Sequence, residues 1–147
     1  MNGDQFFDLA ARLSTSANEV DLRTSVSRSY YGAFHAAREF VEACGVRFAR
    51  SDGGVHTHVK RCLDQSQSDD LVFAADQLNS LRSDRNDADY DLKSTKFQRP
   101  MNAAVRLTVA RAIAAAMQKS SGELTFSKIR DEILSYARDV LRLTVID

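Results

Sequence analysis

The sequence predicts an all-α protein: an up-and-down bundle of four main helices plus short helices, in a single domain that spans residues 1–147. Helix breakers are rare, because the chain has one proline and six glycines. Apolar residues recur at helical spacing along several long segments, and no segment shows the sustained alternation that is typical of a strand. A length of 147 residues suits one hydrophobic core, because two independent cores would each be marginal.

The first half of the chain predicts three helices. The first covers residues 4–17 and the second covers residues 19–43, with Gly45 as the stop just past its end. Residues 46–54 are predicted to form a loop, and a short helix follows over residues 55–63. The apolar positions that repeat at helical spacing in the first two helices are Phe6, Leu9, Ala10 and Leu13, then Val26, Tyr30, Ala33, Ala37 and Val41.

The second half predicts three more helices. One covers residues 69–92 and begins with two aspartates, whose carboxylates complement the helix dipole. Pro100 fits the first position of a helix over residues 100–119, and a last helix covers residues 126–141 after a break at Gly122. Each of these last two helices has one apolar stripe that we expect to be buried in the bundle. In the helix over residues 100–119 the stripe is Met101, Val105, Val109, Ala112 and Ala116, and in the last helix it is Ile129, Ile133, Tyr136 and Val140.

Composition excludes several classes of protein. With 44% apolar and 27% charged residues, the chain has enough apolar material to fold, and no run approaches the ~18–20 apolar residues of a membrane span. Cys44 and Cys62 are too far apart for a C-x-x-C pair, and the first residues carry acids where a secretion signal carries positive charge. We therefore expect a reducing, cytoplasmic setting. His58 and Cys62 are four residues apart, but two ligands do not make a metal site, so no metal is predicted.

Charge is distributed in two opposite blocks although the total is zero. Residues 64–92 carry two basic and eight acidic side chains, whereas residues 93–119 carry six basic and no acidic side chains. The basic block is either a positive surface that meets phosphate or a basic helix that lies against the acidic helix before it. The sequence leaves both interpretations open.

One cation lies on an apolar stripe. In the helix over residues 69–92, position 85 falls in line with Leu71, Ala74, Leu78, Leu81, Ala88 and Leu92, and that position is Arg85. An arginine cannot lose its charge, so the guanidinium must pair with a carboxylate, reach a groove, or meet another chain or an anion. Asp89, four residues on, can pair with it along the helix. The pair is either a satisfied position in the core seam or part of a site.

Two segments resemble the HEPN domain family. The segment SRSYYGAFHAA (residues 27–37) is similar to the second-helix signature of these domains, and LRSDRNDADY (residues 81–90) is similar to their motif region. This second segment is most similar to a branch of small stand-alone HEPN proteins, whose motif contains the sequence R-N-x-A-D-Y. Both segments occur in the right order, and the resemblance covers roughly residues 5–140.

The resemblance implies a HEPN-like helical bundle that forms a homodimer. Active members of the family are metal-independent endoribonucleases with an R-x(4–6)-H motif, which implies no metal and no cofactor. Their cleft lies where two motif helices meet across the dimer. Many are toxins paired with a small MNT nucleotidyltransferase antitoxin, and others act in phage defence. Arg85 matches the motif arginine and Asn86 the polar residue that often follows it, but Tyr90 stands where the motif has histidine.

The predicted catalytic set is therefore Arg85, Tyr90, Asn86 and Asp89. Arg85 would hold the scissile phosphate and its developing charge. Histidine suits proton transfer because its pKa is near 7, whereas tyrosine, with a pKa of ~10, is a poor base that can still donate a proton. Residues five apart differ by about 140° around a helix, so Arg85 and Tyr90 should not share a face.

Three further residues are predicted to bind RNA. Arg82 shares the helix face of Arg85, and Arg28 and His35 share a face of the second helix with Tyr31. His35 can supply the missing imidazole if that face meets the motif helix; otherwise it is a packed core histidine. Two other readings stay open: a non-catalytic HEPN module that binds a nucleotidyltransferase partner or a nucleotide, and a dimeric helical scaffold.

Overall fold

The computed structural model describes residues 1–146 and confirms the predicted all-α class. Six helices and one sheet of two very short strands make up the regular structure of these residues. In chain order the elements are α1 (Asp4–Leu13), α2 (Glu19–Ala43), β1 (Val46–Arg47), α3 (Val55–Asp64), α4 (Asp69–Tyr90), α5 (Pro100–Ser121), α6 (Phe126–Asp139) and β2 (Thr144–Val145).

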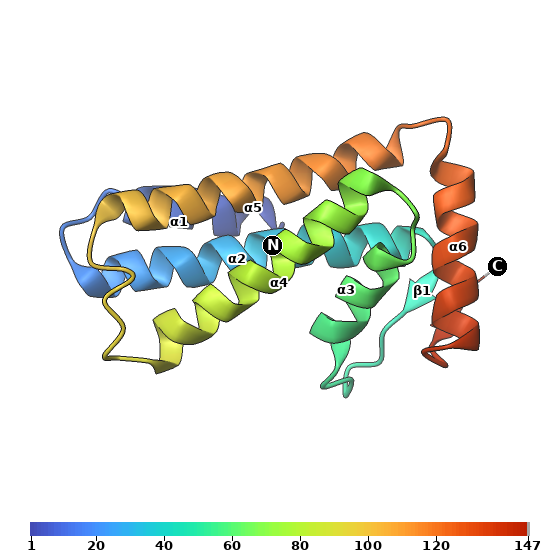
Figure 1. Cartoon of the computed structure of the whole chain (residues 1–147), viewed down its shortest axis with the longest axis horizontal. Helices are drawn as coiled ribbons and strands as arrows, with labels where there is room; N and C mark the ends of the chain where they lie inside the picture. Colours follow the sequence, from blue (N-terminus) through green and yellow to red (C-terminus); the bar gives the residue numbers. More distant parts are fainter. Residues whose placement is uncertain (147) are drawn as a thin grey trace.

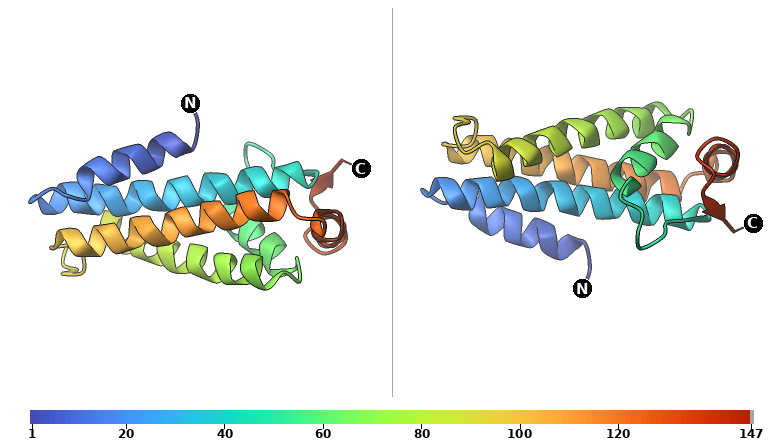
Figure 2. Two further views of the ribbon diagram at one scale, coloured as in Figure 1. Left: turned by 90° about the horizontal axis from the view of Figure 1, so that it is seen from above. Right: turned by 90° about the horizontal axis from the view of Figure 1, so that it is seen from below.

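Four helices form an up-and-down bundle (Figure 1), in which α1, α2, α4 and α5 run in alternating directions. α2 and α5 lie side by side, with α1 and α4 on opposite sides of this pair (Figure 2). The short α3 packs against α2 and α4, and α6 crosses the end of the bundle, so that Figure 2 shows it end-on. The prediction of four main helices with shorter ones is confirmed. None of the helices of residues 1–146 combines the length and apolar content needed to cross a membrane.

The core lies around α2, which is buried along most of its length. A main cluster of apolar side chains joins α2 to every other helix, and a smaller cluster fills the far end of the bundle beside the loop between α4 and α5. The largest fully buried side chains include Tyr30, Phe97, Leu22, Leu63, Leu71, Ile113 and Ile133. Cys44 and Cys62 are buried free thiols, and burial raises the pKa of each to about 12.

Two glycines are required by close approaches. A Cβ on Gly32 would lie 2.5–2.9 Å from three ring atoms of Phe7, so glycine lets α1 pack directly on α2. Gly45 has a φ of +110°, which favours glycine, and its predicted role as the stop of α2 is confirmed.

The first predicted helix extends too far. α1 ends at Leu13 rather than at residue 17, because side-chain hydroxyls replace helical hydrogen bonds there. The Ser14 hydroxyl donates to the carbonyl of Ala11 (2.9 Å), and the Ser16 hydroxyl accepts from the backbone N–H of Asn18 (3.1 Å). α4 and α6 also each end two residues before their predicted ends. Leu92 is consequently exposed instead of buried on the apolar stripe of α4.

The sequence predicts no strand, and this is wrong in one place. Val46 pairs with Val145 and Arg47 with Thr144 in an antiparallel ladder that joins the loop after α2 to the residues after α6. Val46 is fully buried, so its backbone groups need partners. A two-residue strand is too short to show alternation, and its partner is distant in sequence.

The predicted inner face of α5 is also wrong. The buried side chains are Ala103, Leu107, Ala110, Ile113 and Met117. Met101 and Val105, which belong to the predicted stripe, are instead exposed by 73% and 51%. Because α5 is rich in alanine and apolar on both sides, helical spacing alone does not identify the stripe that packs on α2.

The two charge blocks pair with each other, as one of the two interpretations expected. Arg106 lies 3.0 Å from Asp84, and Lys119 lies 2.9 Å from Asp70. Lys96, in the loop before α5, forms a third bridge to Asp87. Ion pairs with α4 therefore neutralise part of the positive charge of residues 93–119.

A buried arginine fixes the end of α4. The Arg23 guanidinium, on α2, donates to the carbonyls of Ala88 and Asp91 (both 3.0 Å) and of Ser94 (2.7 Å), with a longer bond to Asp87 (3.3 Å). Its charge is offset by Glu19 at 2.8 Å and by the Phe97 ring. These bonds satisfy carbonyls that a helix end otherwise leaves unpaired, and so they position the last turn of α4.

Candidate functional site

The motif residues of α4 meet α2 and α3 at one place. Arg85 lies on α4 with its side chain only 11% exposed. Its guanidinium carbon is 5.5 Å from the ring centre of Tyr30, 5.6 Å from that of Tyr31 and 6.0 Å from that of Tyr90. Aromatic faces stabilise a cation that has left water, so three rings offset part of the cost of burying this charge.

The predicted ion pair between Arg85 and Asp89 is present but long. Nη1 of Arg85 lies 3.7 Å from Oδ2 of Asp89, beyond hydrogen-bond distance. The same carboxylate oxygen accepts a hydrogen bond from the Ser27 hydroxyl at 3.3 Å. Nε of Arg85 is buried and has no hydrogen-bond partner. The pair therefore leaves the guanidinium only partly satisfied.

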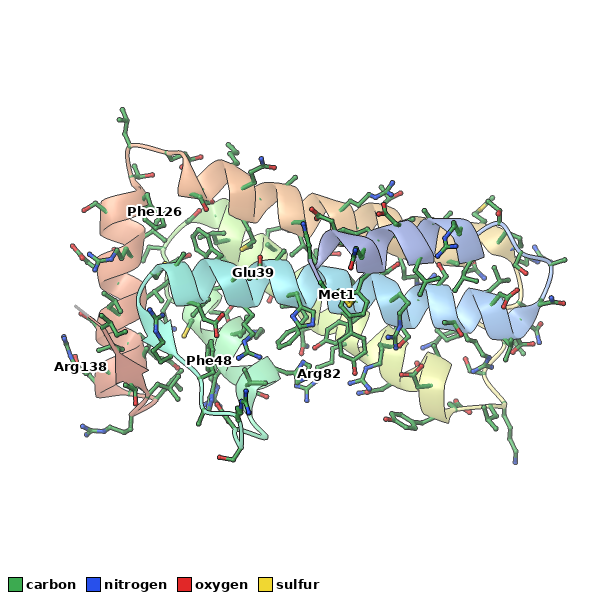
Figure 3. The ribbon with its side chains drawn as sticks, turned by 180° about the vertical axis from the view of Figure 1, so that it is seen from behind. Met1, Glu39, Phe48, Arg82, Phe126 and Arg138 are labelled. Atoms are coloured by element: carbon green, nitrogen blue, oxygen red, sulfur yellow. The ribbon has the colours of Figure 1, made fainter. Side chains whose placement is uncertain are left out.

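Two more arginines lie beside it, and we call Arg28, Arg82 and Arg85 the arginine cluster. Arg82 reaches α3, where its Nη1 donates to the Thr57 hydroxyl at 3.3 Å (Figure 3). Arg28, on α2, lies over the ring of Tyr31 at 5.1 Å and donates to the Ser27 hydroxyl at 3.2 Å. In both residues, as in Arg85, Nε is buried without a partner.

The arginine cluster has an excess of positive charge. Among the described residues, Asp89 is the only carboxylate within 4.0 Å of the three guanidinium groups. Other acids near the end of α4 pair elsewhere, since Asp84 bonds Arg106 and Asp87 bonds Lys96. Three cations with one carboxylate form an arrangement that can bind an anion.

A histidine that the sequence did not indicate completes the site. Nδ1 of His56, on α3, lies 2.5 Å from the Tyr30 hydroxyl, and its ring stacks on Phe34 at 4.1 Å. Burial, together with the charges of Arg82 and Arg85, lowers the pKa of His56 to about 4, and burial raises the pKa of Tyr30 to about 12. Both groups are therefore neutral at pH 7, and the tautomer of the ring decides whether the hydroxyl or Nδ1 is the donor.

Tyr30, His56 and Arg82 line a pocket of about 40 Å³ between α2, α3 and α4. Thr57 and Lys60 line it as well. The pocket has space for one small group, far less than a nucleotide needs. A larger ligand would have to lie across the surface and place only one group here.

Tyr90 is 75% exposed, yet its ring reaches Arg85. The two residues are about 140° apart around a regular helix, yet the side chains are long enough to meet. Asn86 is exposed to solvent, and its side chain makes no hydrogen bond among the described residues. The structure thus brings Arg85, Asp89 and Tyr90 together and shows no hydrogen bond from the Asn86 side chain to any of them.

His35 faces α1 rather than the motif helix. Its ring stacks on Phe6 at 5.4 Å with an interplanar angle of 5°. Burial, with the charge of Arg38, lowers the pKa of His35. Phe6 also lies under the guanidinium of Arg28, at 5.6 Å, so a phenyl ring lies between His35 and Arg28. The imidazole closest to the motif is that of His56.

The described residues contain no group of three histidine, cysteine or acidic side chains that could hold a metal ion. Comparisons with protein-family models, curated proteins and solved structures found no match to this chain. A functional assignment therefore depends on the contacts of the arginine cluster and on the motif resemblance.

Proposed function

We propose that this protein is a cytoplasmic HEPN-family protein that acts on RNA, with the arginine cluster as its phosphate site. The observation that carries the proposal is the excess of positive charge at three neighbouring guanidinium groups, which have only the carboxylate of Asp89 within 4.0 Å among the described residues. A phosphodiester supplies the negative charge that this cluster lacks. Its binding would be favoured by the absence of competing carboxylates around Arg82 and Arg28.

RNA suits the site better than free phosphate does, because exposed aromatic surface adjoins the cations. The Tyr90 ring is exposed beside Arg85, and the half-buried Tyr31 lies between Arg28 and Arg85. Proteins recognise single-stranded RNA by stacking bases on such rings while basic groups hold the backbone. An unpaired nucleotide can therefore place its phosphate on Arg85 and its base on Tyr90.

Cleavage of such a strand needs a base for the 2′-hydroxyl and an acid for the leaving oxygen. In the proposed mechanism Arg85 holds the scissile phosphate and its developing charge, and the Tyr90 hydroxyl donates to an oxygen of the reacting group. Asp89 orients Arg85. Asn86 is a substrate-binding residue in this scheme, since it has no role within the protomer.

His56 is the residue we assign to proton transfer. Burial is the largest cause of the low pKa of its ring, and the charges of Arg82 and Arg85 lower it further. A bound phosphate would offset these charges and so raise the pKa of His56, in the direction where imidazole exchanges protons efficiently.

By resemblance, we assign the protein to the toxin half of a toxin–antitoxin or phage-defence system. The partners in this proposal are RNA, a second copy of the chain and an MNT-type nucleotidyltransferase antitoxin. A small nucleotidyltransferase encoded in the neighbouring reading frame would support the two-component arrangement.

Expression in cells tests the proposal directly. We expect the wild type to slow growth and to cleave RNA, and Arg85→Ala to abolish both effects. Tyr90→Phe keeps the ring and removes only the hydroxyl, so it should lower cleavage while RNA binding remains. Arg12→Ala, an exposed arginine on α1, is the matched control and should behave as wild type. Toxicity that persists in Arg85→Ala would exclude Arg85 as the site.

The alternative function is a non-catalytic module that binds a nucleotidyltransferase partner or a nucleotide. One observation favours it: Tyr90 occupies the position of the motif histidine, so α4 itself carries no imidazole. RNA binding without cleavage by the wild type, in the presence of an intact arginine cluster, would support this alternative. Isothermal titration with a nucleoside triphosphate would then identify the ligand class.

A further inference from the structure

One exposed hydroxyl group on α3 lies against the arginine cluster. Thr57 is exposed to solvent, and its Oγ1 accepts a hydrogen bond of 3.3 Å from Nη1 of Arg82. The described residues that line the pocket of about 40 Å³ beside this contact include Lys60 and no acid. The Thr57 hydroxyl is therefore accessible from outside and already faces a guanidinium group.

Two further cations lie on the same face of α3. Lys60 and Arg61 follow Thr57 at spacings of three and four residues, which place them one turn further along the helix. Side chains of a helix lean toward its N-terminus, so both lean back toward the Thr57 hydroxyl. Lys60 is partly neutralised, because its Nζ lies 2.6 Å from Asp64 and 3.9 Å from Asp76.

The surroundings of this hydroxyl group lack negative charge. Arg61 and Arg82 form no ion pair within 4.0 Å among residues 1–146. The first turn of α3, which contains Thr57, has no acidic residue, and the N-cap Gly54 makes no side-chain hydrogen bond. The dipole of a helix stabilises an anion near its N-terminus. Negative charge on Thr57 would therefore be favoured both by the helix and by the two guanidinium groups.

We propose that Thr57 is a phosphorylation site and that its phosphate closes the arginine cluster to RNA. In this reaction Oγ1 of Thr57 forms a bond to the γ-phosphorus of a nucleoside triphosphate, and the bond from that phosphorus to the β–γ bridging oxygen breaks. The nucleoside diphosphate leaves with the electron pair of the broken bond, and the hydroxyl proton passes to a base of the protein kinase that catalyses the transfer. Helix ends fray, which gives a kinase access to the first turn of α3.

The phosphate would act where RNA is proposed to bind, so this inference rests on the proposed function. A phosphothreonine carries a charge of about −1.5 to −2 at pH 7 and three acceptor oxygens. Because Arg82 already donates to Oγ1, phosphate oxygens on that atom lie within reach of the same guanidinium. This pairing removes Arg82 from RNA, and the added negative charge repels the backbone of an incoming strand. The modified protein would lose RNA affinity without a change of fold.

Phosphothreonine incorporated at position 57 by codon suppression tests the contact without RNA. We expect its ³¹P NMR titration to give a pKa below that of phosphothreonine in a flexible peptide, because the Arg82 guanidinium favours the dianion. Arg82→Gln should return this pKa toward the peptide value. Phosphothreonine at Thr125, an exposed residue at the start of α6, is the matched control and should titrate no lower than the peptide. Equal pKa values at the two positions would overturn the proposal.

Fluorescence anisotropy with a single-stranded RNA oligonucleotide tests the consequence for the site. Phosphorylation at Thr57 should weaken binding about tenfold, and phosphorylation at Thr125 should leave it unchanged. If the unmodified protein binds RNA and the phosphate at Thr57 has no effect, this inference fails and the proposed function stands. If the unmodified protein does not bind RNA, the proposed function fails together with the closing of the site, whereas the NMR titration still decides the contact with Arg82.

Mass spectrometry tests whether the modification occurs. A fraction of the chain purified from the cells that naturally produce it should be heavier by one phosphoryl group, and fragmentation should place this group on Thr57. Thr57→Val expressed in the same cells should lack it. Phosphatase treatment should remove the group from the wild type and restore RNA binding. A chain that is unmodified in both growing and stationary cells, or that carries phosphate only on other residues, would overturn the proposal.

Discussion

The Tyr30 hydroxyl lies 2.5 Å from Nδ1 of His56, and this contact joins α2 to α3 beside the arginine cluster. Tyr30 is buried, and His56 is half-buried. Because Tyr30 keeps its proton and His56 stays unprotonated, the pair holds a neutral imidazole next to Arg82 and Arg85. After proton uptake by His56, Nδ1–H would donate to the Tyr30 hydroxyl oxygen, and the ring would add a fourth positive charge to the site.

The first prediction concerns the pH dependence of stability. The pKa of His56 is lowered in the folded protein, so the unfolded chain binds its proton first as pH falls. The stability from the neutral ring is fully present above about pH 6.5 and is lost as pH falls to about 4. His56→Gln should therefore melt below wild type at pH 7.5, by a margin that shrinks at pH 4.5. A margin independent of pH would show that His56 titrates normally.

The second prediction concerns the same ring when substrate binds. Addition of a single-stranded RNA oligonucleotide should raise the pKa of His56, because the phosphate offsets the charges of Arg82 and Arg85. The shift can be followed by NMR of the imidazole resonances. Arg85→Gln should raise the resting pKa and weaken the response to RNA. An unchanged His56 resonance in saturating RNA would remove this residue from the proposed site.

The third prediction concerns RNA affinity. Arg85→Gln should weaken binding about tenfold or more, since a charge-assisted bond to phosphate is worth roughly 1.5–3 kcal/mol. It should also reduce the slope of log affinity against log salt by about 0.7, the value for one phosphate contact on a single strand. Fluorescence anisotropy at several salt concentrations measures both quantities. The control Arg12→Gln should change neither.

The fourth prediction concerns the packing of α1 on α2. Gly32→Ala places a methyl group against the ring of Phe7, and overpacking of this kind costs about 1–3 kcal/mol. Urea unfolding measures the loss, and Phe7→Leu in the same chain should restore part of it. Gly53→Ala is the matched control, because nothing lies within 4 Å of the added Cβ. Equal effects of the two substitutions would contradict the close contact.

The fifth prediction concerns Arg23. Arg23→Met keeps the length of the side chain but leaves the carbonyls of Ala88, Asp91 and Ser94 without their donor, which should cost about 3 kcal/mol. Hydrogen exchange should show that residues 91–99 lose protection first. Arg38→Met removes a partly exposed pair with Glu42 and should cost less than about 1 kcal/mol.

Local signals in the sequence predicted most of the helices. α2 was predicted at both ends, because its apolar spacing is regular and Gly45 stops it, and Pro100 marked the start of α5. The face of α5 was not predictable from spacing, since alanines make both sides apolar. The strand pair of Val46 and Val145 depends on a contact between distant segments.

The candidate site was predictable only in part, for the same reason. Arg85 stood out because it interrupts an apolar stripe, and its pair with Asp89 lies within one helix. The contact of His56 with Tyr30 joins two helices, and no spacing in the sequence indicates it. The contact between the Tyr90 ring and the Arg85 guanidinium depends on the conformations of the two side chains rather than on the positions of the two residues around the helix.

The hydrogen bonds from Arg23 to the end of α4 affect how a ligand binds to α4, the motif helix. With the last turn of α4 and the following loop tied to α2, little backbone remains to be ordered when a ligand arrives. Association should therefore be fast and show a single kinetic phase, with a heat-capacity change that reflects contact area alone and contains no contribution from coupled folding.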